Sequence, residues 1–307
     1  MKTKYFCVSD IHSYCSHLKS ALKQAGFRKS NKDHILIVCG DVFDRGFETL
    51  ETYEFLKSLP KSRCILVRGN HELLYMDLLR RGYPGSHDFS NGTVRTFCQI
   101  AEINEQELSA SYWYADAAAK GQTTTRAAIN NMISAKWEII RDRVSKHPIT
   151  EWLNSDQWIQ YYELDKYIFV HSFIPIQIKD IPETASIRHY PLSYVPENFI
   201  ETVPDWRNLP SSALAWDDAK WGCPWKQFNA GLFDEEKANN KVLVCGHWHA
   251  SDFHKVYEND KTQNMNLFFS DNLIALDACT AWSQFANVLV IDSGTKNCFD
   301  KFGNQLN

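Results

Sequence analysis

Hydrophobic residues in this chain gather in short runs, and each run ends in a cluster of polar residues. The runs are rich in β-branched side chains and show no alternation of apolar and polar positions. Continuous apolar runs of this length are typical of β-strands that are covered on both faces. The predicted strands of this kind cover residues 5–8, 35–39, 64–67, 167–170 and 242–245.

Amphipathic segments separate the first of these predicted strands. Leu18, Ala21 and Leu22 recur at helical spacing within residues 16–25, and a similar pattern covers residues 48–59. Strands that alternate with helices indicate an α/β core. The end of the chain is different, because strand patterns follow one another there without helices between them. We expect these segments to form an antiparallel extension in a second sheet: residues 272–277, 286–292 and 296–302.

Two stretches interrupt this organisation. Residues 83–165 are predicted to form a helical cap, because apolar residues recur at helical spacing from Ile129 through Trp137 to Val144. We interpret this cap as an insertion within a single domain that spans residues 1–307. Residues 174–240 are rich in proline and tryptophan and weakly periodic, so we expect long, partly ordered loops. Their tryptophans are expected to form a small core of their own: Trp206, Trp216, Trp221 and Trp225.

Composition narrows the class of protein. The 307 residues include 33 Lys and Arg against 37 Asp and Glu, which gives a formal net charge of −4, and 44% are hydrophobic. These values are ordinary for a globular protein and exclude disorder as the main state. No run approaches the roughly 20 apolar residues that span a bilayer, and the N-terminus is typical of a strand and not of a signal peptide. We therefore expect a cytoplasmic protein with no membrane partner and no broad nucleic-acid-binding surface.

The nine cysteines include no Cys-x-x-Cys pair, and their number is odd. Several lie inside the apolar runs, among them Cys7, Cys39 and Cys245. Cysteine in such a position behaves as a small buried hydrophobic residue. The cysteines are therefore predicted to be reduced core residues, and neither a disulfide framework nor a thiolate zinc site is expected.

The polar clusters that follow the predicted strands carry the candidate chemistry. In α/β sheets, ligands bind at the carboxyl ends of the strands. The clusters supply carboxylate, imidazole and amide groups but no thiolate, and this mixture suits Mn, Fe or Zn. They are Asp10-Ile11-His12, Gly40-Asp41-Val42-Phe43-Asp44-Arg45-Gly46, Gly69-Asn70-His71-Glu72, His171, and Gly246-His247-Trp248-His249.

The second and third clusters are far more specific than the others. With all five motifs in this order, the sequence resembles the calcineurin-type metallophosphoesterases, in particular the phosphoprotein phosphatase branch with its bacterial and phage members. The resemblance runs from Lys4 to about Gly294 and is weakest over the cap and over residues 174–240. It implies an α/β fold in which a two-sheet β-sandwich is flanked by helices.

The resemblance also implies a centre of two divalent metal ions. Mn is the first expectation, with Fe, Zn, Mg, Ni or Co as alternatives. The implied ligands are Asp10, His12 and Asp41 for the first ion, and Asn70, His171 and His247 for the second, with Asp41 as the bridge. One carboxylate between two cations screens their repulsion and sets a separation of roughly 3.5–4 Å, and such a pair makes hydroxide available near neutral pH.

Four further residues resemble the family's catalytic groups. His71 matches the general acid that protonates the leaving oxygen, and Asp44 matches the carboxylate that orients its ring. Arg45 and Arg68 match the arginines that hold the phosphoryl oxygens, a task that suits a guanidinium fork. His249 is expected to bind the first metal ion. The alternatives are that it lies behind the metal ligands or that it faces the substrate.

The chain also departs from the family pattern. His171-Ser172-Phe173 stands where the family has His-Gly or His-Ala-Gly. A third phosphate-binding arginine has no match, and Lys220 is the residue that can replace it, as a point charge and not a fork. Asp277, at the end of a predicted strand, is expected to be structural.

The sequence therefore predicts a metal-dependent phosphoester hydrolase. The leading interpretation is a Ser/Thr-type phosphoprotein phosphatase that uses a dinuclear metal centre and metal-bound hydroxide. The first alternative keeps the site but hydrolyses dinucleoside polyphosphates, nucleotides or RNA, because the aromatic-rich segment can stack a base. The second alternative is a non-catalytic scaffold that metal ions stabilise. The expected partners are a phosphorylated protein or a nucleotide, and the oligomeric state is left open.

Overall fold

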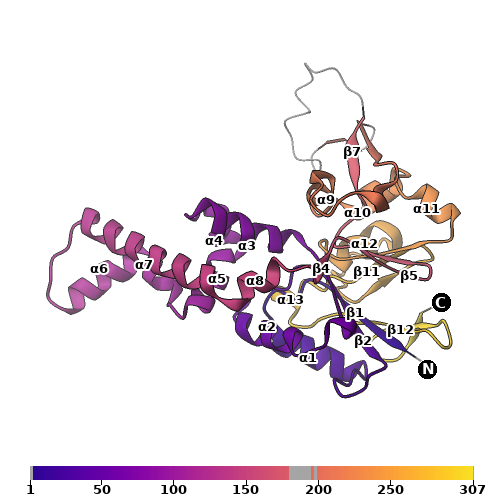
Figure 1. Cartoon of the computed structure of the whole chain (residues 1–307), viewed down its shortest axis with the longest axis horizontal. Coiled ribbons are helices and arrows are strands. Elements are labelled where there is room, and N and C mark those ends of the chain that lie inside the picture. Colours follow the sequence, from indigo (N-terminus) through magenta and orange to yellow (C-terminus); the bar gives the residue numbers. More distant parts are fainter. Residues whose placement is uncertain (1–2, 180–194, 197–198, 307) are drawn as a thin grey trace.

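The computed structural model describes residues 3–179, 195–196 and 199–306, and Figure 1 shows its arrangement. Its larger sheet has seven strands in the order β14-β13-β12-β1-β2-β3-β4. Neighbours from β1 to β4 pair in parallel, whereas β12, β13 and β14 are antiparallel to their neighbours. The strands are β1 (Lys4–Val8), β2 (His34–Cys39), β3 (Cys64–Val67), β4 (Trp158–Ile159), β12 (Leu289–Asp292), β13 (Cys298–Phe299) and β14 (Gln305–Leu306).

A second sheet of five strands has the order β10-β11-β9-β6-β5, and β7 and β8 form a separate antiparallel sheet of two strands. Side chains from both large sheets share one buried cluster, which includes Ile37 and Val67 from the first sheet and Phe169 and Val244 from the second. The strands are β5 (Tyr162–Leu164), β6 (Tyr167–Phe169), β7 (Ile176–Ile178), β8 (Ile200–Thr202), β9 (Val242–Cys245), β10 (Phe268–Phe269) and β11 (Leu273–Ala275).

Helices cover the outer faces of this sandwich. One cluster joins β1 and β2 to α1, α2, α3, α5, α7 and α8, and another joins β9 and β11 to the tryptophan-rich segment and α12. The helices before β4 are α1 (Cys15–Gln24), α2 (Thr49–Lys57), η1 (Lys61–Arg63), α3 (Asn70–Arg81), α4 (Ser86–Asn91), α5 (Thr93–Ala101), η2 (Glu105–Leu108), α6 (Ala110–Ala119), α7 (Arg126–Lys146) and α8 (Pro148–Leu153). The described helices after β8 are η6 (Trp206–Asn208), α9 (Leu214–Ala219), α10 (Pro224–Asn229), α11 (Asp234–Ala238), α12 (Ala250–Glu258) and α13 (Thr280–Ser283). The predicted two-sheet α/β fold is confirmed.

The position of the C-terminal strands differs from the prediction. We expected all three segments to extend a second sheet in antiparallel order. Instead, β12 pairs with β1, with Tyr5 opposite Ile291, and β13 and β14 continue the first sheet. Only β11 lies in the second sheet, where it pairs in parallel with β9. A local apolar pattern predicts a strand, but the contacts that choose its partner come from residues far away in the sequence.

The predicted cap is helical in most of its length. Thr125 caps α7 by accepting a hydrogen bond from the N–H of Ala128, and Trp137 of α7 stacks on Phe97 of α5, 5.9 Å between ring centroids. In Figure 1, α6 and α7 extend away from the sheets as an arm. The end of the range 83–165 differs, because β4 and β5 belong to the two sheets and the helices end at Leu153. The division into one domain with an inserted cap stays a prediction.

The tryptophan-rich segment is more ordered than expected within the described residues. Trp206 and Trp216 are buried together with Phe233, and Trp225 packs against them, as the core interpretation predicts. Trp221 differs, because 38% of it is exposed. Residues 180–194 and 197–198 of the predicted loops lie outside the described part of the chain.

Two expectations from composition can be compared with the structure. In the described residues, the cysteines form no disulfide, and all except Cys279 are buried. Among the described helices, none combines the length and the apolar character that crossing a membrane requires.

Candidate metal centre

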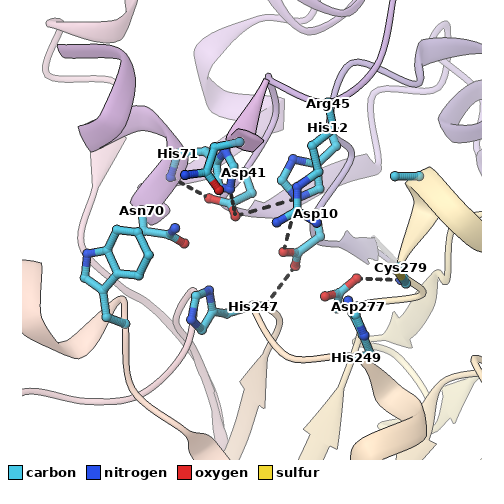
Figure 2. A pocket seen from close by; sticks show the side chains of 13 residues that line it. Asp10, His12, Asp41, Arg45, Asn70, His71, His247, His249, Asp277 and Cys279 are labelled. Atoms are coloured by element: carbon cyan, nitrogen blue, oxygen red, sulfur yellow. Dashed lines mark hydrogen bonds and ion pairs between the residues drawn. The ribbon is translucent and has the colours of Figure 1, made fainter. Parts of the chain in front are cut away.

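The polar loops after β1, β2, β3, β6 and β9 meet at one pocket, which Figure 2 shows from close by. The main chain ties the loops together, because Asp10 N–H donates to the Gly40 carbonyl (3.2 Å) and Gly246 N–H to the His171 carbonyl (2.7 Å). Eight predicted site residues line the pocket: Asp10, His12, Asp41, Arg45, Asn70, His71, His247 and His249. Asp44 and His171 are buried directly behind it.

Two groups of side chains in this pocket can each hold a metal ion. His12, Asp41 and His71 form one group, and Asp41, His171 and His247 form the other, with all ligand atoms of a group within 4.8 Å. Asp41 belongs to both groups. Their carboxylate and imidazole donors are the chemistry that Mn, Fe and Zn prefer, so the residues fit divalent ions.

The remaining predicted ligands lie beside these two groups. Asp10 Oδ1 is 3.9 Å from His12 Nε2, and Asn70 Oδ1 is 2.7 Å from His171 Nε2. His249 lines the pocket but is in neither group. His71, which we expected to be the acid and not a ligand, lies in the first group with its Nε2 3.8 Å from Asp41 Oδ2.

Burial sets the charge of the pocket. Burial, then Asp277 and Asp41, raise the pKa of Asp10. Burial also raises the pKa of Asp41, but the surrounding histidines outweigh it and hold that pKa below its ordinary range. Burial and the neighbouring His171 lower the pKa of His247 to about 3. The Asp41 carboxylate beside a neutral His247 is the state that binds a cation, whereas the raised pKa of Asp10 means that a bound cation would displace its proton.

The backbone of the loops is held in an uncommon conformation. Positive φ angles occur at non-glycine residues on three of the loops: Asp10 (52°), His12 (49°), Asp41 (55°), Asp44 (73°), Arg45 (59°) and His247 (66°). Each such residue costs on the order of 1–3 kcal/mol, and such strain gathers at functional sites. Hydrogen bonds between the loops offset it, for example Gly46 N–H to the His12 carbonyl (2.9 Å).

Glu72 is a further supporting residue, to which sequence reasoning assigned no role. Its buried carboxylate accepts hydrogen bonds from the N–H groups of Asp41 (3.0 Å), Val42 (3.0 Å) and Gly69 (2.7 Å). Burial and the Asp41 carboxylate raise the pKa of Glu72 to about 7. The signal was present in the sequence, because Glu72 stands three residues after the helix-capping Gly69, as in a capping box.

Gly246 shows why a glycine precedes His247. A Cβ at this position would collide with the Ser9 hydroxyl and the Asp10 carboxylate. His247 N–H also donates to Asp10 Oδ2 (3.0 Å). The loop after β9 therefore packs directly against the loop after β1, and this contact joins the two halves of the pocket.

His71 is held by a carboxylate, as the sequence predicts. Its Nδ1 lies 2.7 Å from Asp44 Oδ2, and Asp44 accepts further hydrogen bonds from Thr93 (2.8 Å) and Thr96 (2.7 Å) of α5. Burial lowers the pKa of His71, but Asp41 and Asp44 outweigh it, so that the pKa is raised overall. A raised pKa is what a proton donor at neutral pH needs.

The structure does not bring Arg68 into the pocket. Its Nη2 donates to the carbonyl of Leu153 (2.9 Å), and its guanidinium lies 6.0 Å from the ring centroid of Trp158. Lys220 does not line the pocket either, and its Nζ donates to the Trp216 carbonyl (2.9 Å) and to Asp217 Oδ1 (3.2 Å). Burial lowers the pKa of Lys220 to about 8. Arg45 is thus the only predicted phosphate-binding cation among the described residues that line the pocket.

Some lining residues were not predicted as site residues. Asp277 was expected to be structural, and its carboxylate does accept the N–H of Cys279 (2.6 Å), but it also lines the pocket together with Asp10 and His249. The others are Asn91, Trp221, Cys279 and Ala281. No local motif marks these residues, because only the packing of distant segments places them here.

The profile of the calcineurin-like phosphoesterase family matches residues 3–251. The chain belongs to this family. The predicted family and the prediction of a hydrolytic enzyme are thereby confirmed, and the pocket holds the metal-binding type of side chain that the family match leads one to expect.

Relatives of this calcineurin-like phosphoesterase have two kinds of name. The symmetrical bis(5'-nucleosyl)-tetraphosphatase of Aliivibrio salmonicida is 26% identical over 308 residues, which cover 94% of this chain and 96% of that protein. The protein of the same name from Psychromonas ingrahamii is 43% identical over 68 residues, only 22% of this chain and 24% of that protein. The Shewanella-like protein phosphatase 1 of Plasmodium berghei is 39% identical over 82 residues, 23% of each.

A solved structure shares the fold. A point mutant of a cold-active protein tyrosine phosphatase superposes with a TM-score of 0.51 at 15% identity, over 100% of this chain and 80% of that one. This likeness concerns the arrangement of the sheets and helices and gives no information about the substrate.

Proposed function

We propose that the protein is a dinuclear metal-dependent hydrolase whose substrate is a dinucleoside polyphosphate. The observation that carries the chemistry is the pair of potential metal groups that share Asp41, next to the hydrogen-bonded pair of His71 and Asp44. The tetraphosphatase of Aliivibrio salmonicida, which matches nearly the full length, supports the substrate.

The proposed ligands are the seven residues expected from the sequence: Asp10, His12, Asp41, Asn70, His171, His247 and His249. Two ions bound there, with Mn as the proposed metal, would polarise the phosphoryl group as Lewis acids and supply a nucleophile at neutral pH. The chain's own part is to fix their positions through the loop contacts and through the three hydrogen bonds that Glu72 accepts.

The other residues handle the phosphate and the leaving group. Arg45 lines the pocket and is proposed to bind the phosphoryl oxygens. His71 is proposed to donate a proton from Nε2 to the leaving oxygen, while Asp44 accepts the hydrogen bond of the Nδ1 proton and fixes the ring. Arg68 is proposed as a phosphate contact only if its hydrogen bond to Leu153 opens when substrate binds.

Hydrolysis of p-nitrophenyl phosphate with added Mn²⁺ tests the chemistry. We expect turnover by the wild type and its loss in Asp41→Asn, which removes the shared carboxylate. Asp116→Asn, on the distant arm helix α6, is the matched control and should retain activity. If no divalent metal supports hydrolysis, the proposed function is wrong.

A phosphoprotein phosphatase is the second candidate. The order of the motifs and the partial match to the Plasmodium berghei protein phosphatase favour it. Comparing kcat/KM for diadenosine tetraphosphate with that for phosphoserine and phosphothreonine peptides separates the two candidates. Higher values for the peptides would replace the dinucleoside substrate.

A metal-stabilised scaffold is the least supported interpretation. Binding of metal requires neither the hydrogen bond between His71 and Asp44 nor the two threonine hydroxyls that hold Asp44. A purified protein that binds two metal ions tightly but hydrolyses no phosphoester would favour the scaffold.

A further inference from the structure

The metal pocket is too small to hold a nucleoside. It encloses about 80 Å³, far below the roughly 300–1,000 Å³ of sites that bind drug-sized ligands. A substrate that carries nucleosides must therefore place them outside this pocket, next to its rim.

One larger hollow continues from the pocket along α12 and α13. It encloses about 630 Å³ and shares His249 and Cys279 with the metal pocket. The short helix α13 borders both cavities, because its residue Ala281 lines the metal pocket and the next residue, Trp282, lines the hollow. Trp282 is 63% exposed, which is unusual for so large an aromatic ring beside a catalytic centre.

The charges in this first hollow are balanced. Lys255 and Lys261 line it, but so do Asp252 and Asp260, and the carboxylate of Asp260 is held by the N–H (2.8 Å) and hydroxyl (2.7 Å) of Thr262. The charges of this hollow therefore do not favour anions in general. Its exposed ring gives it affinity for another flat ring, since base–aromatic stacking needs no particular base.

A second hollow is linked to the loop that carries Arg45, although it shares no lining residue with the metal pocket. It encloses about 580 Å³ and is lined by Phe47 and Phe89. Each of these rings is two residues from a residue of the metal pocket, Arg45 and Asn91. Phe47 is 67% exposed, and the guanidinium of Arg95 lies over its ring at 4.5 Å from the centroid.

Arg95 also connects this second hollow to the pocket. Its Nη1 donates to the carbonyl of Arg45 (2.7 Å), and its Nε pairs with Glu105 (2.9 Å). One face of Phe47 is thus covered by a fixed guanidinium, which leaves the other face for a ligand ring. The loop that places Arg45 in the pocket is the loop that presents Phe47.

We propose that the two hollows bind the two nucleosides of a dinucleoside polyphosphate, with one base on Trp282, the other on Phe47, and the phosphates across the metal pocket between them. This inference rests on the proposed function. Two flanking aromatic hollows fit a substrate with a ring at each end better than a mononucleotide or a phosphorylated side chain.

Calorimetric titration tests this proposal without catalysis. The probe is a diadenosine tetraphosphate with a non-hydrolysable central methylene bridge, and inorganic tetraphosphate, which has no nucleosides, is the reference; both are titrated with Mn²⁺ in excess. We expect Trp282→Ala and Phe47→Ala each to weaken the dinucleoside analogue about 5- to 100-fold relative to tetraphosphate. Trp282→Phe and Phe47→Tyr, which keep a ring, should stay near the wild type.

Phe302→Ala controls for the loss of an exposed ring, because Phe302 is 60% exposed and lines none of the three cavities described here. The proposal is overturned if the wild type binds the analogue no tighter than tetraphosphate, or if only one alanine variant weakens it. A phosphopeptide whose affinity depends on both rings, when that of the analogue does not, would also overturn it. A protein that binds the analogue through both rings but hydrolyses no phosphoester would contradict the proposed function alone.

Discussion

His71 is the residue at which the metal groups and the proton-donating pair meet. One nitrogen of its ring faces Asp41, and the other is hydrogen-bonded to Asp44. A ring held in this way can give a proton to a leaving group only from the nitrogen that faces the pocket. The role proposed for His71 therefore depends on Asp44 as much as on His71 itself.

The proton-donating role predicts a dependence on the leaving group. His71→Asn should lower kcat about 10²- to 10⁴-fold for an alkyl phosphate such as phosphoserine, whose leaving oxygen needs a proton. The loss should be much smaller for p-nitrophenyl phosphate, because nitrophenolate leaves readily without one. Steady-state kinetics with both substrates checks this. Equal losses for the two would indicate that His71 acts as a metal ligand instead.

Glu72 predicts a structural effect at the same scale. Glu72→Gln replaces a carboxylate oxygen with an amide donor that faces the N–H groups of Asp41, Val42 or Gly69. We expect the free energy of unfolding to fall by about 1–3 kcal/mol, the cost of an unsatisfied buried donor. Urea denaturation measures it.

Glu48→Gln is the matched control for Glu72→Gln. The Glu48 carboxylate also accepts a backbone hydrogen bond, from Ser16 N–H (2.8 Å), but in an exposed position. Water can replace the hydrogen bond that Glu48→Gln removes, so the free energy of unfolding should fall by less than in Glu72→Gln. Similar losses in both variants would contradict a special role of the Glu72 carboxylate.

At the scale of elements, Arg207 joins the tryptophan-rich segment to the second sheet. Its guanidinium forms a two-pronged pair with Glu236 of α11 (2.6 and 2.8 Å) and reaches Glu163 of β5 (2.6 Å). Burial raises the pKa of Glu236, but the hydrogen bonds from Arg207 and Trp206 outweigh it and hold that pKa below its ordinary value. α11 and β5 are therefore tied together by charge as well as by apolar contacts.

This lowered pKa predicts how stability depends on pH. The ionised Glu236 stabilises the fold at pH values above the unfolded-state pKa, and this contribution disappears as the pH falls through the lower folded-state pKa. We expect Glu236→Gln to lower the free energy of unfolding by about 1–2 kcal/mol at pH 7, allowing for the partial exposure of Arg207.

Urea denaturation at a series of pH values checks this prediction. The difference between wild type and Glu236→Gln should shrink as the pH falls from 4.5. Glu235→Gln, at the exposed neighbouring position of α11, is the control and should match the wild type throughout. A difference that does not change with pH would mean that packing, and not the charge of Glu236, is lost.

At the scale of the whole molecule, the pocket lies where the two sheets meet. Asp10, Asp41 and Asn70 come from the first sheet, and His171 and His247 come from the second. A metal ion bound between them would join the two halves of the sandwich, and it would bind the folded chain more tightly than the unfolded one. Such binding adds to the stability of the fold.

Removal of metal is therefore expected to lower the melting temperature. At an ion concentration of about 100 Kd the stabilisation is about 2.7 kcal/mol, which corresponds to roughly 4 °C for a protein of this size. Melting with EDTA and after addition of Mn²⁺ measures this shift. Asp41→Asn should lose most of it and Asp116→Asn none. A wild type that melts at one temperature under both conditions would contradict a metal centre.

The sequence allowed the core of the site to be predicted because its residues stand next to strands. Asp10, Asp41 and Asn70 each follow an apolar run that can be recognised locally, and the carboxyl ends of such strands meet at one edge. Arg68 satisfies the same rule, yet its guanidinium donates to the carbonyl of Leu153 at the end of α8. The position directly after a strand fixes where the backbone of a residue lies. The neighbouring groups decide where its side chain points.

By itself, the sequence determined the strands that end at the site and the first helices between them, which family the chain belongs to, and which carboxylates and imidazoles follow those strands. These features follow from local periodicity and from motifs of adjacent residues. Only the tertiary structure decided that β12 pairs with β1, that Asp277 lines the same pocket as Asp10, and that Trp282 and Phe47 each line a hollow outside the metal pocket. The reason is physical: such contacts join residues that are far apart in the chain, and their energy depends on the whole packed core.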